Sequence, residues 1–203
     1  MATRTRTPTK TVAASPAGRS GGHHVALIRG INVGRAKRVA MADLRALLGS
    51  LGYGEVRTLL NSGNAVFRMP ASAPAKAAAR IEEGMTRRLG VSARVTVLTA
   101  RELDTLVADN PLVKKATDHS RLMVAVLFTR SDLKKLQPLL RRDWAPEALA
   151  LGERVAYVWC PSGIIESPLF TAITRELADG VTARNWATMI KLHALVAPAS
   201  GKD

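Results

Sequence analysis

The segment LIRGINVGRAKRV, residues 27–39, has the residue types and spacing of an anion-binding loop. A strand that ends in glycines, an amide and cations can present backbone N–H groups and a guanidinium to a phosphate or carboxylate. The spacing matches neither GxxxxGK[ST] nor GxGxxG, so a nucleotide-binding loop is not expected. The alternative is a tight loop whose cations point into solvent. The candidate ligand-binding residues of this segment are Arg29, Asn32, Gly34 and Lys37.

A second candidate is the segment NSGN, residues 61–64, which is typical of a hairpin turn with Gly63 at positive φ. Turn chemistry alone explains it, but Ser62 and Asn64 are also candidate ligand-binding residues. We take the first and third strands to be adjacent and parallel in the sheet. This turn would then lie at the opposite end from the loop after Arg29, and the two segments would form separate sites.

The third candidate is VTARNWATMIKLH, residues 181–193, in which we expect a helix capped by Thr182. A helix N-terminus beside an arginine is suited to an anion. The candidate residues are Arg184, Asn185 and Lys191, with Arg184, Thr188 and Lys191 forming a polar stripe. The opposite stripe is expected to pack in the core and contains Trp186, Met189, Ile190 and His193. In the structural alternative Arg184 pairs with a carboxylate.

The sequence predicts no catalytic, metal-binding or cofactor-binding residues. The motifs HExxH, CxxC and GxSxG are missing from the sequence, and the histidines are not spaced as metal ligands. The three candidate segments are rich in Asn, Ser, Arg and Gly, which bind and orient but do not titrate near neutral pH. Cys160 is expected to be a buried thiol.

The overall composition favours an anionic partner. The chain has 203 residues, 47% hydrophobic residues and a net charge of +14, which suits one globular domain or two small ones. The excess charge favours nucleic acid or a phosphorylated small molecule, although a generally basic proteome would also explain it. Aromatic residues make up only 4%, so binding would occur through phosphates and not through stacked bases.

Several features indicate a cytoplasmic protein. One cysteine permits no internal disulfide, and no apolar run approaches the ~20 residues of a membrane-spanning helix. Residues 1–22 are basic and lack an apolar core, which predicts a disordered arm and not a secretory signal. Residues 198–203 are expected to be a disordered C-terminus.

Hydrophobic periodicity divides the remaining chain into two similar halves, residues 23–111 and 120–197. The first half has the order β-α-β-β-α-β of a split βαβ unit, followed by a helix that Thr99 and Glu102 can cap. Its elements are a strand at 23–30, a helix at 41–52, a hairpin at 55–69, a helix at 73–90, a strand at 93–99 and the connecting helix at 99–111.

The second half repeats this order of elements without obvious residue identity. We therefore expect an α+β fold of two ferredoxin-like subdomains, with sheets packed either edge to edge or face to face. The elements are a strand at 121–128, a short helix at 131–140 capped by Ser131, a hairpin at 154–167 turning at 161–163, a helix at 168–180, and a short strand or cap leading into a helix at 181–196.

Three sequence blocks together resemble the signatures of the domain-of-unknown-function 1697 family. They are LIRGINVG to SGNAVF, then VTVLTARELDTLVADNPL, and then TARNWATMIKL, in the family's order between about His24 and Leu195. The resemblance implies an α+β fold built from two ferredoxin-like subdomains. It implies no reaction.

We interpret the chain as a non-catalytic binder of an anionic ligand, either nucleic acid or a phosphorylated small molecule. One alternative is an enzyme for a small anionic substrate, oriented by Arg29, Asn32, Ser62 and Arg184. Another is an interaction module that forms a homodimer through a free sheet edge. The three differ in whether the candidate side chains converge in one place with free hydrogen-bonding groups.

Overall fold

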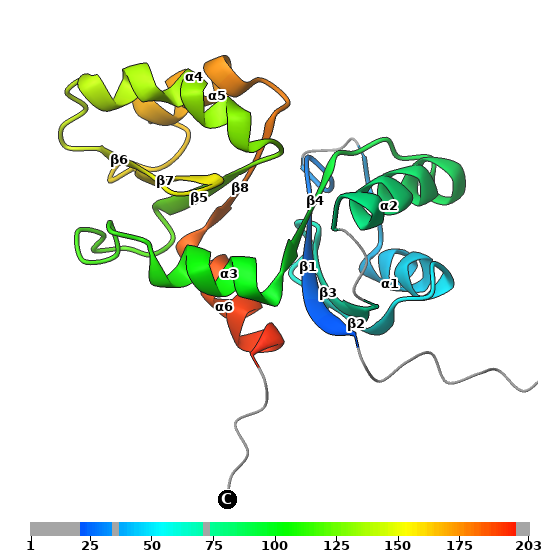
Figure 1. Cartoon of the computed structure of the whole chain (residues 1–203). Helices are drawn as coiled ribbons and strands as arrows, with labels where there is room; N and C mark the ends of the chain where they lie inside the picture. Colours follow the sequence, from blue (N-terminus) through cyan, green and yellow to red (C-terminus); the bar gives the residue numbers. More distant parts are fainter. Residues whose placement is uncertain (1–20, 34–36, 71–73, 198–203) are drawn as a thin grey trace, which may run out of the picture.

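The computed structural model contains two four-stranded antiparallel sheets, each covered by helices (Figure 1). It describes residues 21–33, 37–70 and 74–197. The predicted N-terminal arm up to residue 20, the C-terminus at 198–203 and the candidate residue Gly34 lie outside the described residues. The fold is α+β with two ferredoxin-like subdomains, as the sequence predicts.

The first sheet follows the predicted element order, and its strands are arranged β2-β3-β1-β4. Alternation along the strands gives each sheet two buried faces, and α1 and α2 cover the outer one, which carries Ala26, Ile28 and Phe67. The elements are β1 (Gly22–Ile28), α1 (Met41–Ser50), β2 (Gly54–Leu59), β3 (Asn64–Met69), α2 (Pro74–Leu89) and β4 (Val95–Thr99).

The second sheet has the equivalent order β6-β7-β5-β8, with α4 and α5 on its outer face. Its elements are β5 (Leu122–Leu127), the 3₁₀ helix η1 (Arg130–Asp132), α4 (Leu133–Leu136), the 3₁₀ helix η2 (Gln137–Arg141), β6 (Ala148–Leu151), β7 (Val155–Trp159), α5 (Pro168–Leu177) and β8 (Val181–Asn185).

Two predictions for the second half are wrong. The hairpin joins β6 to β7 and turns at residues 152–154, and residues 161–163 lie instead in the loop that leads to α5. The segment ALAL that forms β6 lacks β-branched and aromatic residues, so it carries no strand signal of its own. Ser131 lies within η1 and does not cap a helix, and Pro138 stands where the helical stretch continues as η2.

Two helices follow directly from the last strand of each half. Thr99 ends β4 and caps α3 (Ala100–Ala108) through the predicted capping box with Glu102. Asn185 ends β8 and caps α6 (Trp186–Val196), with its side chain accepting from the Thr188 N–H at 2.9 Å. The expected cap, Thr182, is instead a buried residue of β8.

These two helices fill the space between the sheets, whose inner faces point toward each other (Figure 1). Together they form a central core that neither half could build alone. It contains Val25, Leu27, Val66 and Leu98 from the first sheet, Leu103 and Leu106 from α3, Val124, Val126, Val155, Tyr157 and Trp159 from the second sheet, and Trp186, Met189, Leu192 and Val196 from α6. The two sheets are separate and meet through α3 and α6, so the edge-to-edge arrangement that the sequence left open is not the one in the structure.

None of the helices in the described ranges combines the length and the apolar character needed to cross a lipid bilayer.

Candidate functional site

The loop after β1 and the turn between β2 and β3 lie at the same end of the first sheet. We expected opposite ends, and this is wrong because β1 and β3 are antiparallel, with Leu27 opposite Asn64. The end of β1 therefore meets the start of β3, and the Ile28 N–H donates to the Gly63 carbonyl oxygen at 2.8 Å. The first two candidate segments thus form one structure.

Gly63 makes this close approach possible. Its φ is +78°, and an added Cβ would lie 2.9 Å from Cγ1 of Ile31 and 3.0 Å from Cβ of Ile28. Only glycine fits both the backbone conformation and the space. The glycine of the SGN block thus serves the packing of the turn against β1.

Asn32 fastens the loop to the turn. Its Nδ2 donates to the carbonyl oxygens of Val39 at 2.9 Å and Asn61 at 2.7 Å, while its Oδ1 accepts from the Val39 N–H at 2.9 Å. Its φ of 56° lies in the left-handed region, which asparagine tolerates better than most residues. Both ends of this carboxamide are therefore used to hold the backbone.

Asn64 and Ser62 complete the turn. Asn64 is fully buried, and its Nδ2 donates to the Leu59 carbonyl and the Ser62 hydroxyl, each at 3.0 Å. Its Oδ1 accepts from Nε of Arg184, which comes from the other half of the chain. The third candidate segment therefore meets the first two.

All three side-chain nitrogens of Arg184 donate hydrogen bonds, and two of them, Nε and Nη2, join the two halves. Its Nη1 donates to the Thr182 hydroxyl at 3.2 Å and the Ala183 carbonyl at 2.7 Å. Its Nη2 donates to carbonyl oxygens of the first half, which are those of Ile28 at 2.8 Å, Ser62 at 3.0 Å and Gly63 at 3.4 Å. With Nε on Asn64, every guanidinium N–H has an acceptor.

Burial of the Arg184 guanidinium lowers its pKa to about 10, so the group remains charged at neutral pH. The sequence predicts Arg184 in a helix, and this is wrong, because Arg184 lies in β8 opposite Val124. It therefore forms no helical stripe with Thr188 and Lys191. Lys191 is exposed on α6, away from this junction. On the apolar stripe, Ile190 is 38% exposed and His193 pairs with Asp104 at 2.6 Å.

Three cations, Arg29, Lys37 and Arg94, gather beside this junction near the Asp179 carboxylate, and Nε of Arg94 also lies 3.6 Å from the Glu82 carboxylate. Arg29 begins the same loop and pairs with Asp179, which follows α5 in the other half. The Arg29 N–H donates to the Arg94 carbonyl at 2.8 Å, and the Arg94 guanidinium stacks 4.4 Å over Phe128. The hydrogen bond from Arg29, and then the charges of Arg29, Arg94 and Lys37, lower the pKa of Asp179.

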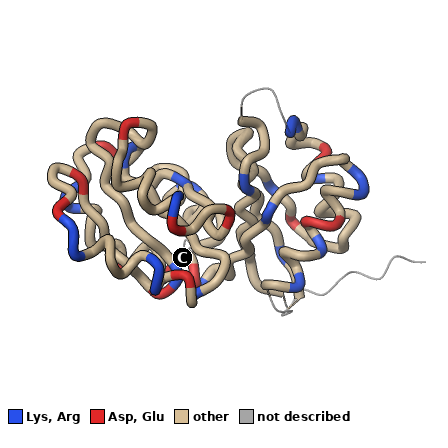
Figure 2. Tube along the Cα trace, turned by 90° about the horizontal axis from the view of Figure 1, so that it is seen from above, with Lys and Arg blue, Asp and Glu red and all other residues tan. Residues whose placement is uncertain are grey.

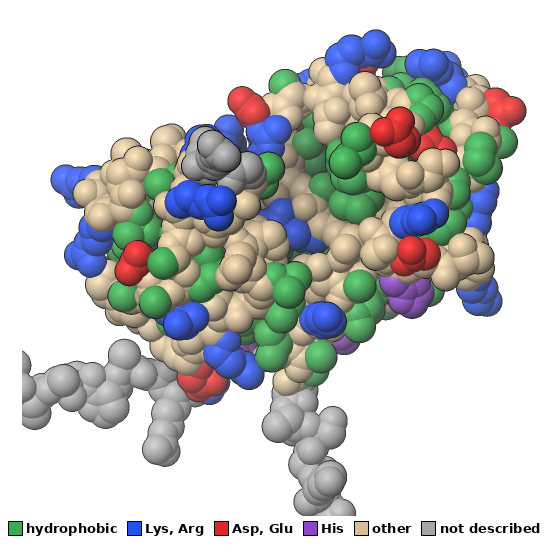
Figure 3. Space-filling view, turned by 180° about the vertical axis from the view of Figure 1, so that it is seen from behind, with side chains coloured by type: hydrophobic (Ala, Val, Ile, Leu, Met, Phe, Trp, Pro, Cys, Tyr) green, Lys and Arg blue, Asp and Glu red, His purple; other side chains and the backbone are tan. Residues whose placement is uncertain are grey.

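The molecular surface is hollowed between the two halves, and Lys and Arg side chains lie around this hollow (Figure 3). Basic and acidic residues are otherwise spread over both halves (Figure 2). We define the cation corner as Arg29, Lys37 and Arg94 together with Asp179, the partner of Arg29.

Sequence reasoning missed Arg94 and Asp179. Arg94 directly precedes β4, whose first residue Val95 lies opposite Ile28, so the sheet register would have placed it beside Arg29. Asp179 is 150 positions from Arg29 in sequence, and no motif connects the two.

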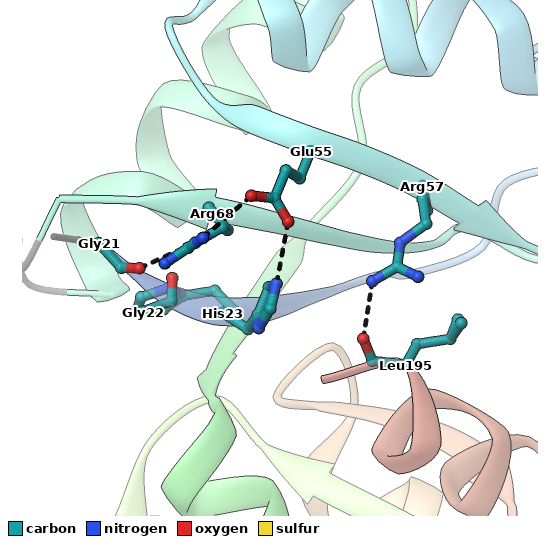
Figure 4. A network of polar contacts seen from close by, with 8 residues as sticks. Gly21, Gly22, His23, Glu55, Arg57, Arg68 and Leu195 are labelled. Carbon is teal, nitrogen blue, oxygen red and sulfur yellow. Dashed lines mark hydrogen bonds and ion pairs between the residues drawn. The ribbon is translucent and has the colours of Figure 1, made fainter. Parts of the chain in front are cut away.

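A second polar contact between the halves lies at the edge strand β2 (Figure 4). Nη2 of Arg57 donates to the Leu195 carbonyl at 2.8 Å, near the C-terminal end of α6, where a cation is favourable. Beside it, Glu55 accepts from Arg68 at 3.0 Å and lies 3.4 Å from Nε2 of His23. These charges are satisfied within the fold.

The remaining side chains that could act as a nucleophile or as metal ligands are not arranged to do so. Cys160 is buried, and this burial raises the pKa of its thiol to about 11, so the thiol is not a nucleophile at neutral pH. In the described parts of the chain, no group of three His, Cys, Asp or Glu side chains could hold a metal ion.

The fold and the junction define a class of protein in which two ferredoxin-like units share a central core and are joined at strand ends by loop, turn and strand segments. The family model "Protein of unknown function (DUF1697)" matches residues 22–157, and the chain belongs to this family.

Among solved structures, the chain is similar to "conserved bacterial protein SP0830 from Streptococcus pneumoniae". The sequence identity is 20%, the TM-score is 0.67, and the match covers 87% of this chain and 99% of the other. At this identity the likeness concerns the fold alone. A search of the curated proteins finds no match.

Proposed function

We propose that this protein binds a phosphate-bearing ligand at the cation corner without catalysing a reaction. The observation that carries the proposal is that Arg29 pairs with the exposed carboxylate of Asp179, on which the charges of Arg94 and Lys37 also act. The Asp179 side chain is 83% exposed and can move aside. Its carboxylate marks the position that an anionic ligand oxygen would take.

Phosphate groups suit this corner because arginine can bind them with two parallel hydrogen bonds. A phosphate monoester offers three terminal oxygens and up to two negative charges, and a nucleic-acid strand offers a series of singly charged phosphodiesters, so either can contact more than one cation. The net charge of +14 would attract such a ligand from solution. Nucleic acid and phosphorylated small molecules share this group, and the experiment below distinguishes them.

The alternatives have less support. In the enzyme hypothesis, Asn32 and Arg184 would orient a substrate. Their polar groups instead form hydrogen bonds with backbone atoms of the fold. A homodimer through the edge of β2 would have to accommodate the bulge between Gly54 and Arg57, and bulges and edge charges oppose strand pairing. We also propose a cytoplasmic location, because Cys160, the chain's single cysteine, is free.

The test compares Arg29→Gln with Arg141→Gln, a matched removal of one positive charge. Arg141 is exposed at the end of η2, which contacts β6 at the opposite end of the second sheet from Asp179. Pyrophosphate binding is measured by calorimetry, and binding of a labelled 20-nucleotide single-stranded DNA by fluorescence polarisation. We expect Arg29→Gln to weaken binding about tenfold, since it removes a charge-assisted hydrogen bond.

Equal binding by the two variants contradicts the proposal. If pyrophosphate saturates the corner and displaces the DNA, the ligand is a phosphorylated small molecule. If the DNA binds with a steep dependence on salt concentration and pyrophosphate competes poorly, the ligand is nucleic acid.

A further inference from the structure

A cavity of about 340 Å³ lies between the two halves, at the other end of β1 from the cation corner. One wall is α3 with the end of β4. The other consists of β5, β7 and the turn between β6 and β7, so both halves contribute to it. Figure 1 shows α3 lying along the second sheet. The proposed phosphate-binding function does not use this cavity.

The wall formed by α3 carries separated, opposite charges. Arg101, Thr105 and Asp109 are spaced four residues apart, so they follow one face of the helix, and all three line the cavity. Arg101 and Asp109 are eight positions apart, which corresponds to about 12 Å along the helix axis. Within the described residues, neither the Arg101 guanidinium nor the Asp109 carboxylate has a side-chain partner, whereas Thr105 offers a hydroxyl between them.

The facing wall is apolar and electrically balanced. Val126, Val155 and the ring of Tyr157 line it, and the Tyr157 hydroxyl donates to the Leu106 carbonyl at 2.8 Å.

The charges at the rim of this wall are already paired. Arg130 bonds Glu153 at 2.8 Å, and Arg154 lies 3.6 Å from Glu102. The free charges of the cavity are therefore those on α3.

We propose that this cavity binds a short peptide of two or three apolar residues with free termini. Its carboxylate would meet Arg101, its ammonium would meet Asp109, and its apolar side chains would lie against Val126, Val155 and Tyr157. Three extended residues span about 10 Å, which is comparable to the about 12 Å between positions 101 and 109 along the helix axis. A ligand with only one charge would leave Arg101 or Asp109 without a partner.

The probe is the tripeptide Ala-Leu-Ala with free termini, measured by calorimetry on the full chain. We expect one peptide to bind per chain with a dissociation constant below about 1 mM. N-acetylation or C-amidation should each weaken binding about tenfold, because each removes a charged hydrogen bond. Asp109→Asn should weaken the free peptide to the same degree and leave the affinity of the N-acetylated peptide unchanged.

Two further variants separate binding from folding. Asp43→Asn removes an exposed helix carboxylate from α1 and should bind as the unchanged protein does. Thr105→Trp places a large side chain at an exposed position of the cavity wall and should abolish binding with an unchanged melting temperature. The proposal is overturned if no heat is observed at about 1 mM peptide, if acetylated and free peptides bind equally, or if Asp109→Asn has no effect on the free peptide.

Discussion

At the scale of single residues, the strongest signature positions hold the molecule together. Arg184 and Asn32 come from different sequence blocks, yet both side chains donate to backbone carbonyls at the junction of the loop after β1 and the β2–β3 turn. Arginine is suited to this role because its planar guanidinium can bridge several fixed acceptors at once. A cation in a motif is therefore not by itself a ligand site, and its acceptors have to be counted first.

Replacing Arg184 should be costly. Arg184→Ala leaves the carbonyls of Ile28 and Ser62 and the buried amide of Asn64 without their charged donor. We expect the free energy of unfolding to fall by about 3 kcal/mol, as measured by urea denaturation.

Arg184→Lys provides the matched comparison. It keeps the charge but has a single nitrogen in place of three, so it should recover only part of the loss. Arg141→Ala, at an exposed position, should change the free energy of unfolding by less than about 0.5 kcal/mol. A loss below about 1 kcal/mol in Arg184→Ala would show that the hydrogen bonds of Arg184 add little to stability.

At the scale of elements, strands and helices with clear periodicity could be predicted, and their contacts across the chain could not. Short apolar runs indicated β1, β5 and β7, and the Thr99 capping box indicated the start of α3. The segment ALAL gave no strand signal, because β6 is defined by its pairing with β7 and not by its own residues.

The candidate site was predictable only in part. Sequence identified Arg29 and Lys37 of the corner, and the parallel orientation assumed for β1 and β3 separated two segments that in fact touch. The same error concealed why the SGN and RGINVG blocks occur together. Asp179 is brought to the cation corner by tertiary packing alone, which local sequence patterns do not encode.

The β2–β3 turn contains a testable strain. Leu60 has a φ of 57°, a left-handed conformation that costs a side chain with Cβ about 1 kcal/mol, and it is 54% exposed. Leu60→Asn should therefore raise the free energy of unfolding by about 0.5 kcal/mol, because asparagine tolerates this conformation. Thermal and urea unfolding measure the change.

Leu140 provides the control, because it is 43% exposed and is not among the residues with positive φ. Leu140→Asn should give no gain. An equal gain in both variants would assign the effect to the removal of exposed apolar surface and not to the backbone.

At the scale of the whole molecule, the two halves resemble separate domains in topology but not in their cores. The inner faces of both sheets contribute to one central core with α3 and α6. Residues such as Val25, Leu27 and Val66 are fully buried in this core, to which the second half contributes side chains. The halves should therefore fold and unfold as one unit.

Calorimetry checks this expectation. The full chain should show a single transition with a calorimetric enthalpy equal to the van't Hoff enthalpy. A fragment of residues 21–111 should bind a hydrophobic dye and lack a cooperative transition, because its inner sheet face is uncovered. Two separate transitions, or a cooperatively folded fragment, would contradict the shared core.

The fully engaged guanidinium of Arg184 also limits how the molecule can move. Its donors hold the strand ends of both halves at one junction, whereas at the proposed peptide cavity the halves are joined by Arg154 with Glu102 and by the Tyr157 hydroxyl on the Leu106 carbonyl. Any rocking of one half against the other would pivot at Arg184, with the largest displacement beside α3. Arg184 would then be the fixed point of this motion, and the cavity beside α3 would be the opening whose width changes most.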